Sequence, residues 1–353
     1  MNHFRHIFFF KFVIGLLFLH FLNAGQLRAQ DIQYSQFYNV PMYQNPAFAG
    51  SAHALRVTGH QRLQWPSLDA KYSTSLISVD HFFHNFNSGV GLMVQKDFQG
   101  AKNISSTEVH GLYSYELPVS RELTVRGGLD LGYVSRFTNY NVTVPQQFNS
   151  NGQIPGALNP YSDLTKTHGY VDVSAGGLVY SKQWWAGIAA GHLDSPNQSP
   201  IKSAPSHLPM KFSLTGGYKI PLIHKKYMAY MEEETEVSLT PTFHYKSQGK
   251  SDQLDLGAYV RYSEILFGAW YRGIPVKHYR TIAGRRLPNP ESIVLMVGWK
   301  YQSISITYSY DVVISRLGGY NPGGSHELNI TWVHHKHKKK HKPMKRLPCP
   351  SFH

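Results

Sequence analysis

Residues 121–137 read Arg121-Glu-Leu-Thr-Val-Arg-Gly-Gly-Leu-Asp-Leu-Gly-Tyr-Val-Ser-Arg-Phe137, and apolar and polar side chains alternate along them. Only Val134 and Ser135 interrupt the alternation. Side chains of a β-strand point to opposite faces with a period of two, so the stretch predicts one strand with one apolar face. The same pattern recurs at 252–262, 303–311 and 327–332. The chain is therefore expected to be all-β.

The length of these segments distinguishes a membrane barrel from a soluble sandwich. A sandwich buries its apolar face in a core, whereas a membrane barrel turns it toward lipid and fills the lumen with its polar face. Several segments sustain the alternation for 11 residues or more. Strands of globular proteins usually stop at about 5–6 residues, while a tilted membrane-spanning strand needs about 9–11. The pattern thus favours a transmembrane antiparallel β-barrel.

About fourteen strands are expected, an even number as in single-chain bacterial barrels. They are placed at His53–Gln64, Ala70–His81, Ser88–Lys96, Asn103–Leu117, Arg121–Phe137, His168–Tyr180, Gln183–His192, Lys211–Pro221, Glu234–Lys246, Asp252–Tyr262, Glu264–Gly273, Glu291–Tyr301, Ser303–Val313 and Gly324–His334.

Connection lengths support a barrel independently. The connections after odd-numbered strands tend to be long, and those after even-numbered strands are mostly short, with one exception at Leu222–Glu233. Outer-membrane barrels have long loops outside the cell and tight turns on the periplasmic side. The long ones are Thr138–Thr167, Leu193–Met210, Ile274–Pro290 and Ile314–Gly323.

The first 29 residues have the order of a secretory signal peptide. Arg5 precedes an apolar run from Ile7 to Leu22, and small residues follow up to Ala29, after which cleavage is expected. The alternative is an uncleaved membrane anchor, which His20 and Asn23 disfavour because they interrupt the run. The rest of the chain has no apolar run of 18 residues. Export to the bacterial outer membrane is the prediction.

The net charge of +14 is concentrated at the two ends of the chain. Three cationic residues lie in the signal peptide and seven in the C-terminal tail, so the body is nearly balanced and predicts no nucleic-acid partner. Residues 30–52 are expected to form an N-terminal periplasmic segment, 53–334 the barrel, and 335–353 a basic periplasmic tail that binds acidic partners. The cationic residues of the tail are Lys336, Lys338, Lys339, Lys340, Lys342, Lys345 and Arg346.

The sequence contains none of the compact motifs of enzymes or metal sites, such as HExxH, CxxC or GxSxG. Ser325, His326 and Glu327 are consecutive, so on a strand they cannot converge as a catalytic triad. The histidines of the tail are a weak metal-binding candidate because cationic neighbours repel a divalent ion. Glycine pairs such as Gly127-Gly128 are interpreted as barrel geometry. We predict a non-enzymatic protein without a cofactor.

Five blocks in order along the chain resemble the PorP/SprF family of outer-membrane proteins of Bacteroidota. The resemblance extends over essentially the whole mature chain, and its most specific blocks are Asn45–Gly50 and Gly324–Glu327. The blocks are Tyr34-Ser-Gln-Phe-Tyr-Asn-Val-Pro-Met-Tyr-Gln-Asn-Pro-Ala-Phe-Ala-Gly50, Gln61-Arg-Leu-Gln-Trp65, Gly91-Leu-Met-Val-Gln-Lys-Asp97, Tyr308-Ser-Tyr-Asp311 and Gly324-Ser-His-Glu327.

This resemblance implies a role in type IX secretion and gliding motility. The expected partners are periplasmic ring proteins of the secretion machinery, or a large secreted adhesin with a type B C-terminal domain. The motif residues serve either to dock a partner or to seat the N-terminal segment in the barrel mouth. They are Tyr38, Asn45, Pro46, Phe48, Gly50, Trp65, Gly324, Ser325, His326 and Glu327. The basic tail departs from the family, whose members are expected to end near the last strand.

A second functional hypothesis is a diffusion channel or small-solute transporter in the outer membrane. Such a channel needs an open lumen. The bulky side chains on the polar face argue mildly against one, and they include His60, Arg126, Arg136 and Tyr259.

Overall fold

The computed structural model describes residues 31–68, 72–100, 104–138, 166–199, 205–222, 237–280, 286–315 and 323–334 of the 353-residue chain. The predicted signal peptide and the basic tail lie outside these ranges. The strands are β1 (Leu55–Gln64), β2 (Tyr72–Phe83), β3 (Ser88–Gln99), β4 (Ile104–Pro118), β5 (Thr124–Thr138), β6 (Lys166–Tyr180), β7 (Trp184–Gly191), β8 (Lys211–Tyr218), β9 (Ile220–Pro221), β10 (Val237–Gln248), β11 (Ser251–Tyr262), β12 (Ile265–Arg280), β13 (Arg286–Tyr301), β14 (Ile304–Val313) and β15 (Ser325–His334).

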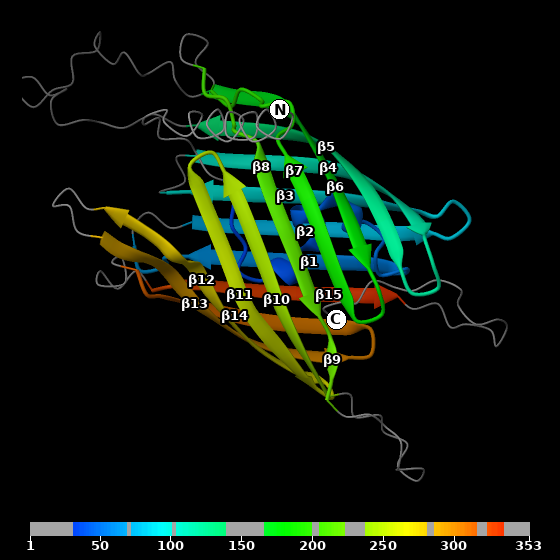
Figure 1. Cartoon of the computed structure of the whole chain (residues 1–353). Coiled ribbons are helices and arrows are strands. Elements are labelled where there is room, and N and C mark those ends of the chain that lie inside the picture. The colour runs from blue at the N-terminus through cyan, green and yellow to red at the C-terminus, as the bar shows by residue number, and fades with distance from the viewer. Residues whose placement is uncertain are drawn as a thin grey trace, which may run out of the picture.

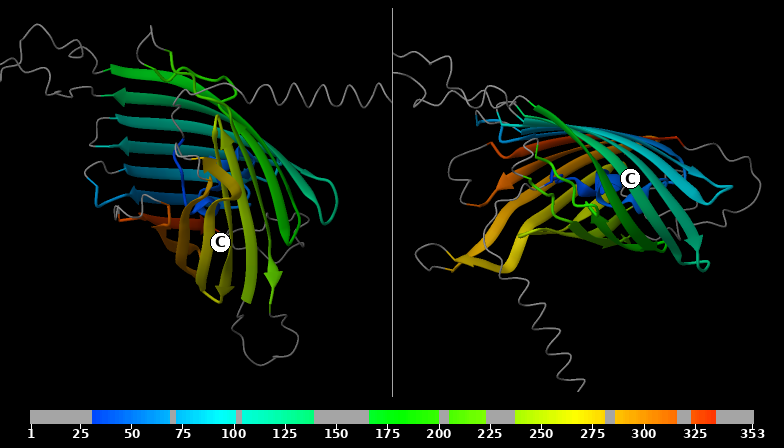
Figure 2. Two further views of the ribbon diagram at one scale, coloured as in Figure 1. Left: turned by 60° about the vertical axis from the view of Figure 1, so that its left-hand side comes forward. Right: turned by 90° about the horizontal axis from the view of Figure 1, so that it is seen from above.

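These strands form one closed antiparallel barrel (Figures 1 and 2). Each strand pairs with its neighbours in sequence, and β1 closes the ring by pairing with β15 from Leu55↔His334 to Gln64↔Ser325. Only Lys219 separates β8 from β9, and both pair with β10, so they share one of fourteen positions in the wall. Closure gives each of the fourteen wall positions a paired neighbour on both sides over at least part of its length, which satisfies backbone groups that could not face hydrocarbon unpaired.

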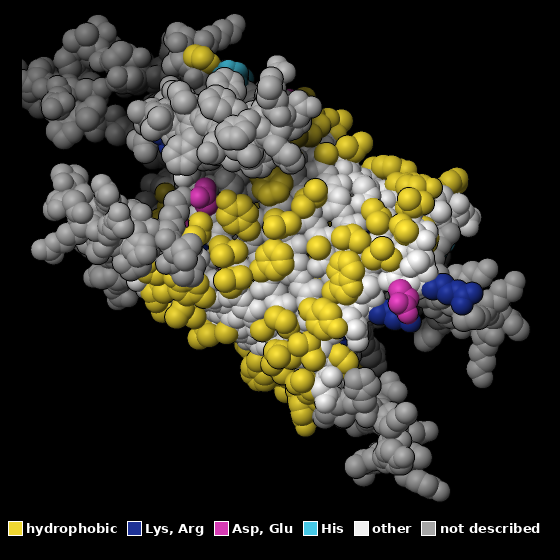
Figure 3. Space-filling view, in the orientation of Figure 1, with side chains coloured by type: hydrophobic (Ala, Val, Ile, Leu, Met, Phe, Trp, Pro, Cys, Tyr) yellow, Lys and Arg dark blue, Asp and Glu magenta, His cyan; other side chains and the backbone are white. Residues whose placement is uncertain are grey.

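Burial along the strands is the reverse of that in a soluble protein. On β5 the apolar Leu129 and Leu131 are 61% and 63% exposed, whereas the charged Arg126 and Asp130 are buried. Figure 3 shows apolar side chains spread over the outer face of the wall. Among the described residues, no helix has the length and apolarity needed to cross a membrane. The exposed apolar side chains of the closed wall form the face that meets hydrocarbon in a transmembrane β-barrel.

The predicted strands agree with the structure except at one connection. The sequence predicts a loop at Ile274–Pro290, but β12 continues to Arg280 and β13 starts at Arg286. This prediction was wrong because prolines and a glycine break the alternation there. The extension is a two-stranded ribbon with register shifts near Gly273 and Ile274. It projects beyond the ring (Figure 1), and its unpaired outer edges tolerate proline.

The two ends of the barrel differ, and we name them by their connections. The loop rim is the end where β1 stops at Gln64, with connections 65–71, 139–165 and 192–210 (at the left in Figure 1). The turn rim is the end where β1 starts and β15 stops at His334. It carries the turns 84–87, 119–123, 181–183 and 302–303 and also the longer connection 222–236.

The outer face can be tested with an arginine substitution at mid-wall. Leu131→Arg places a cation against hydrocarbon and is expected to lower the free energy of unfolding in lipid vesicles by about 2–4 kcal/mol. Glu122→Arg, at an exposed position in the turn 119–123, is the control and should change it little. Urea titration followed by tryptophan fluorescence measures both. Equal stability of the two variants would contradict a lipid-facing Leu131.

Candidate functional site

The lumen is occupied by residues 31–54, which we call the lumen segment. It contains three short helices, η2 (Phe37–Asn39), α2 (Pro41–Gln44) and η3 (Pro46–Phe48), drawn in blue within the ring in Figures 1 and 2. Proline stands in the first turn of α2 and of η3, where its missing N–H is not needed. The Asn45 side chain caps η3 by accepting a hydrogen bond from the Ala47 N–H at 2.9 Å.

Glu327 on β15 holds the N-terminal half of the segment. Its carboxylate is 1% exposed and accepts hydrogen bonds from the backbone N–H groups of Ser35 at 2.7 Å and Gln36 at 2.8 Å. Arg62 on β1 forms an ion pair with the same carboxylate. A buried carboxylate is stable only when it is paired and hydrogen-bonded, so the segment and the wall complete one another's polar groups.

A second buried charge network lies beside the first. Arg272 on β12 contacts two carboxylates, Asp255 at 2.7 Å and Asp311 at 2.9 Å, and donates to the Ser35 hydroxyl at 3.0 Å. That hydroxyl in turn donates to Asp311. Strands β11, β12 and β14 and the segment are thus joined by charge-assisted hydrogen bonds, which are stronger than neutral ones.

Aromatic packing fixes the middle of the segment. The Tyr38 ring stacks on Trp270 of β12 with centroids 4.7 Å apart, and Phe37 stacks on His244 of β10 at 5.1 Å. Phe48 belongs to the same buried cluster. Aromatic pairs of this kind add about 0.5–1.5 kcal/mol each beyond the burial of their area.

Glycines in the wall let the second half of the segment approach the strand backbones. A Cβ atom at Gly176 would lie 2.1 Å from Asn45 Oδ1, and one at Gly128 would lie 2.3 Å from the Ala47 nitrogen. A Cβ atom at the neighbouring Gly127, which faces outward, would meet nothing within 4 Å. The glycine pairs were interpreted from the sequence as barrel geometry. At Gly128 and Gly176 a side chain is excluded because the lumen segment lies in close contact with the strand there.

The end of the segment is tied to the turn rim. The backbone N–H of Gly50 donates to Asp80 at 2.7 Å, and Arg56 forms an ion pair with the same carboxylate at 2.8 Å. His53 contacts Glu116 at 2.6 Å, and Arg126 pairs with Glu116 at 2.9 Å. Gly50 has φ 69°, a backbone conformation that favours glycine and turns the chain into β1.

The structure places the predicted motif residues in two regions. Those of the N-terminal block all lie buried in the lumen, as do Ser325 and Glu327, while the His326 side chain lies on the outer face and contacts Tyr308. Trp65 and Gly324 meet at the loop rim, where the Trp65 N–H donates to the Gly324 carbonyl at 2.8 Å. The buried N-terminal residues are Tyr38, Asn45, Pro46, Phe48 and Gly50.

Sequence reasoning did not identify the wall residues that bind the segment. Arg62, Asp255, Arg272 and Asp311 are charged residues at inward positions of strands. Charged residues at inward positions of the strands were a signal that other polar groups occupy the lumen beside them. Three charged residues of β5 each have a different partner: Arg126 contacts Glu116, Asp130 contacts His110, and Arg136 contacts Gln198.

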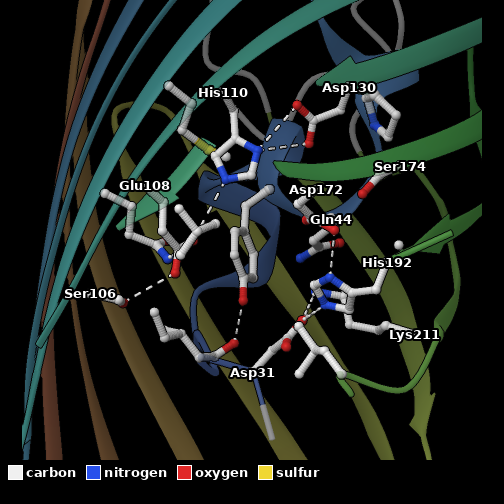
Figure 4. A pocket seen from close by; sticks show the side chains of 18 of the residues that line it. Asp31, Gln44, Ser106, Glu108, His110, Asp130, Asp172, Ser174, His192 and Lys211 are labelled. Carbon is white, nitrogen blue, oxygen red and sulfur yellow. Dashed lines mark hydrogen bonds and ion pairs between the residues drawn. The ribbon is translucent and has the colours of Figure 1, made fainter. Parts of the chain in front are cut away.

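A cavity of about 100 Å³ lies at the loop rim, between the segment and strands β3 to β8 (Figure 4). Two histidines line it, each between two carboxylates. His192 is 2.8 Å from both Asp172 and Asp31. His110 is likewise placed between Asp130 at 3.0 Å and Glu108 at 3.6 Å. No group of three or more metal-ligating side chains with suitable geometry occurs in the described part of the chain.

Charge fixes the first described residue of the segment at this cavity. Burial disfavours ionisation of Asp31, but the Lys211 ammonium at 2.8 Å and the His192 ring outweigh it and hold the pKa of this carboxyl well below its usual range. Burial also opposes protonation of His192, yet its bonds with Asp172 and Asp31 raise the pKa of the imidazole to about 9. The contacts of Asp31 with Lys211 and His192 therefore hold the start of the described segment at the loop rim.

The glycine contacts provide a matched pair of variants. Gly128→Val forces a methyl-bearing side chain against the Ala47 backbone and is expected to displace the segment, at about 1–3 kcal/mol. Gly127→Val adds the same atoms on the open outer face and should leave the segment in place. Limited proteolysis of the folded protein, read by cleavage within 31–54, measures the difference. Equal protection in both variants would contradict the packing of η3 against β5.

Comparison with solved structures finds outer-membrane barrels of low sequence identity. Omp33 of Acinetobacter baumannii is 6% identical, with a TM-score of 0.40 over 81% of this chain and 100% of that one. The toluene transporter TbuX of Ralstonia pickettii is 10% identical, with a TM-score of 0.42 over 84% and 92%. BamA of Haemophilus ducreyi lacking POTRA domains 1–3 is 7% identical, with a TM-score of 0.39 over 80% and 70%. Such scores say nothing about function.

No curated protein sequence matches the chain. A family profile does: the one described as type IX secretion system membrane protein PorP/SprF matches residues 26–332. That match includes the lumen segment, strands β1 to β14 and all but the last two residues of β15, and with the barrel fold it places the protein in the outer membrane. The chain belongs to the PorP/SprF family of type IX secretion system membrane proteins.

Proposed function

We propose that the protein is a closed, non-conducting scaffold barrel of the type IX secretion machinery, which retains a partner protein at the outer membrane. The supporting observation is the lumen segment, whose aromatic rings, ion pairs and backbone contacts occupy the interior. A barrel whose lumen is filled by its own chain has no continuous water path for solutes. Its two rims remain as the surfaces on which it can bind a partner. The partner is a periplasmic ring protein of the machinery or a large secreted adhesin with a type B C-terminal domain.

The filled interior argues against the alternative of a diffusion channel. A channel requires a continuous polar path between the two rims. Below the cavity at the loop rim, two clusters of buried apolar side chains join the segment to opposite parts of the wall. The first cluster contains Phe37, Tyr38 and Phe48, and the second contains Tyr34 and Met42.

The two rims suit different partners. The loop rim carries the longer connections and the charged cavity, so it is the side for a secreted adhesin. The turn rim carries the end of β15 at His334, from which the basic tail 335–353 continues. Seven cationic residues within that tail attract an acidic protein surface by charge. We therefore assign the machinery's periplasmic proteins to the tail.

Conductance tests the closed lumen. The full-length protein in planar bilayers is expected to give no steady open-channel current. Deletion of residues 31–52 removes the ion-pair partners and aromatic rings that fill the interior, so this variant should conduct, provided that its heat-modifiable gel mobility shows a folded barrel. Gly127→Val serves as the silent control. A steady current from the full-length protein would favour the channel and contradict the proposed function.

The role of the tail is tested by co-purification from the native cell. A variant in which the seven cationic residues become glutamine keeps the length of the tail but removes its charge. It is expected to lose periplasmic machinery proteins while any secreted adhesin stays bound, as judged by quantitative mass spectrometry. Glu122→Gln at the turn rim is the control. Unchanged recovery would remove the role of the tail, and absence of all type IX secretion proteins from the full-length sample would contradict the scaffold.

A further inference from the structure

The first and last residues of the lumen segment lie at opposite rims. Asp31 is held at the loop rim, where its backbone N–H donates to the Gln248 side chain at 3.0 Å and its carboxylate contacts Lys211 and His192 at 2.8 Å. These partners stand at the loop-rim ends of β10, β8 and β7. The segment ends at Ala54, directly before β1 begins at the turn rim.

Contacts with β14 show that residues 35–39 run from the loop rim toward the turn rim. This strand runs from Ile304 at the turn rim to Val313 at the loop rim. Successive residues of the segment bond to successively deeper inward positions of it: Ser35 to Asp311, Gln36 to Ser309 at 3.1 Å, and Asn39 to Thr307 at 2.7 Å.

The second half of the segment completes the crossing. Asn45 donates to the Gly177 carbonyl of β6 at 2.9 Å, about four-fifths of the way along that strand from the loop rim. Gly50 then reaches Asp80, close to the turn-rim end of β2, and His53 reaches Glu116, close to that of β4. Between these two sets of contacts, α2 passes beside the loop-rim cavity, where the Tyr43 hydroxyl donates to the Ile32 carbonyl at 2.6 Å and the Gln44 carbonyl accepts from Ser213 at 3.2 Å.

We infer that the lumen segment crosses the membrane inside its own barrel, so that the mature N-terminus and the end of β15 lie on opposite sides of the membrane. With the turn rim in the periplasm, the N-terminus is on the cell surface, beside the loops that face an extracellular partner. This topology differs from the expectation that residues 30–52 lie in the periplasm with the tail. It holds whichever partner the barrel binds.

The segment also binds the seam at which the ring closes. β1 and β15 are the strands that close the ring, and the segment bonds to Arg62 and Glu327 on its inner side at that seam.

Pairs of cysteines test this topology whichever way the barrel is inserted in the vesicle, because the number of adducts per molecule is counted. The only native cysteine, Cys349, is replaced by serine. One reporter is a Gly-Ser-Cys insertion between Gln30 and Asp31. The reference cysteines are Ser67→Cys at the loop rim and Glu122→Cys at the turn rim, both at exposed positions. The full-length protein is purified from outer membranes and reconstituted into sealed vesicles.

A membrane-impermeant polyethylene-glycol maleimide is then added, and adducts are counted by gel mobility of the folded fraction. The insertion paired with Glu122→Cys is expected to take one adduct in every molecule, and two after the vesicles are opened with detergent. The insertion paired with Ser67→Cys is expected to take two adducts or none. Ser67→Cys paired with Glu122→Cys, whose sites lie at opposite rims, is the reference for one adduct per molecule. The reverse assignment of the first two pairs would overturn the crossing, whether or not the scaffold function holds.

Discussion

A wall that turns its apolar face toward hydrocarbon has only its polar face left for the interior, and the rest of this molecule depends on that constraint. Inward-facing carboxylates and guanidinium groups are expensive to bury without partners. The lumen segment supplies many of those partners from its own backbone and hydroxyl groups. Glu327 illustrates the arrangement, since it binds two backbone N–H groups of the segment and Arg62 of the neighbouring strand β1.

The interior is therefore held by both kinds of interaction found in protein cores. Ion pairs and charge-assisted hydrogen bonds tie the first part of the segment to β1, β12, β14 and β15, and the aromatic cluster around Trp270 packs its middle against β12 and neighbouring strands. Glycines at 128 and 176 bring the segment to the wall where helices η3 and α2 meet it. A filled lumen of this kind leaves the two rims as the surfaces on which a secretion protein can bind partners.

The fold could be predicted from sequence because strand alternation is a local property. Val125 to Phe137 already shows which face meets lipid, and the structure places Leu129 and Leu131 there. The β12–β13 ribbon was missed because its prolines hide the strand period. The lumen segment could not be placed, since its contacts are long-range: Ser35 and Glu327 are 292 residues apart. The family resemblance included both the N-terminal block with Ser35 and the Gly324–Glu327 block. No local sequence pattern, however, indicated that these two blocks are in contact.

Hydrogen exchange of the lumen segment tests the central claim most directly. In lipid nanodiscs, the backbone amides of Ser35 and Gln36 donate to a buried carboxylate, and the peptide that contains them is predicted to exchange as slowly as peptides of β14 and β15. Exchange of that peptide within seconds, at the rate of an unstructured chain, would contradict a segment packed inside the barrel.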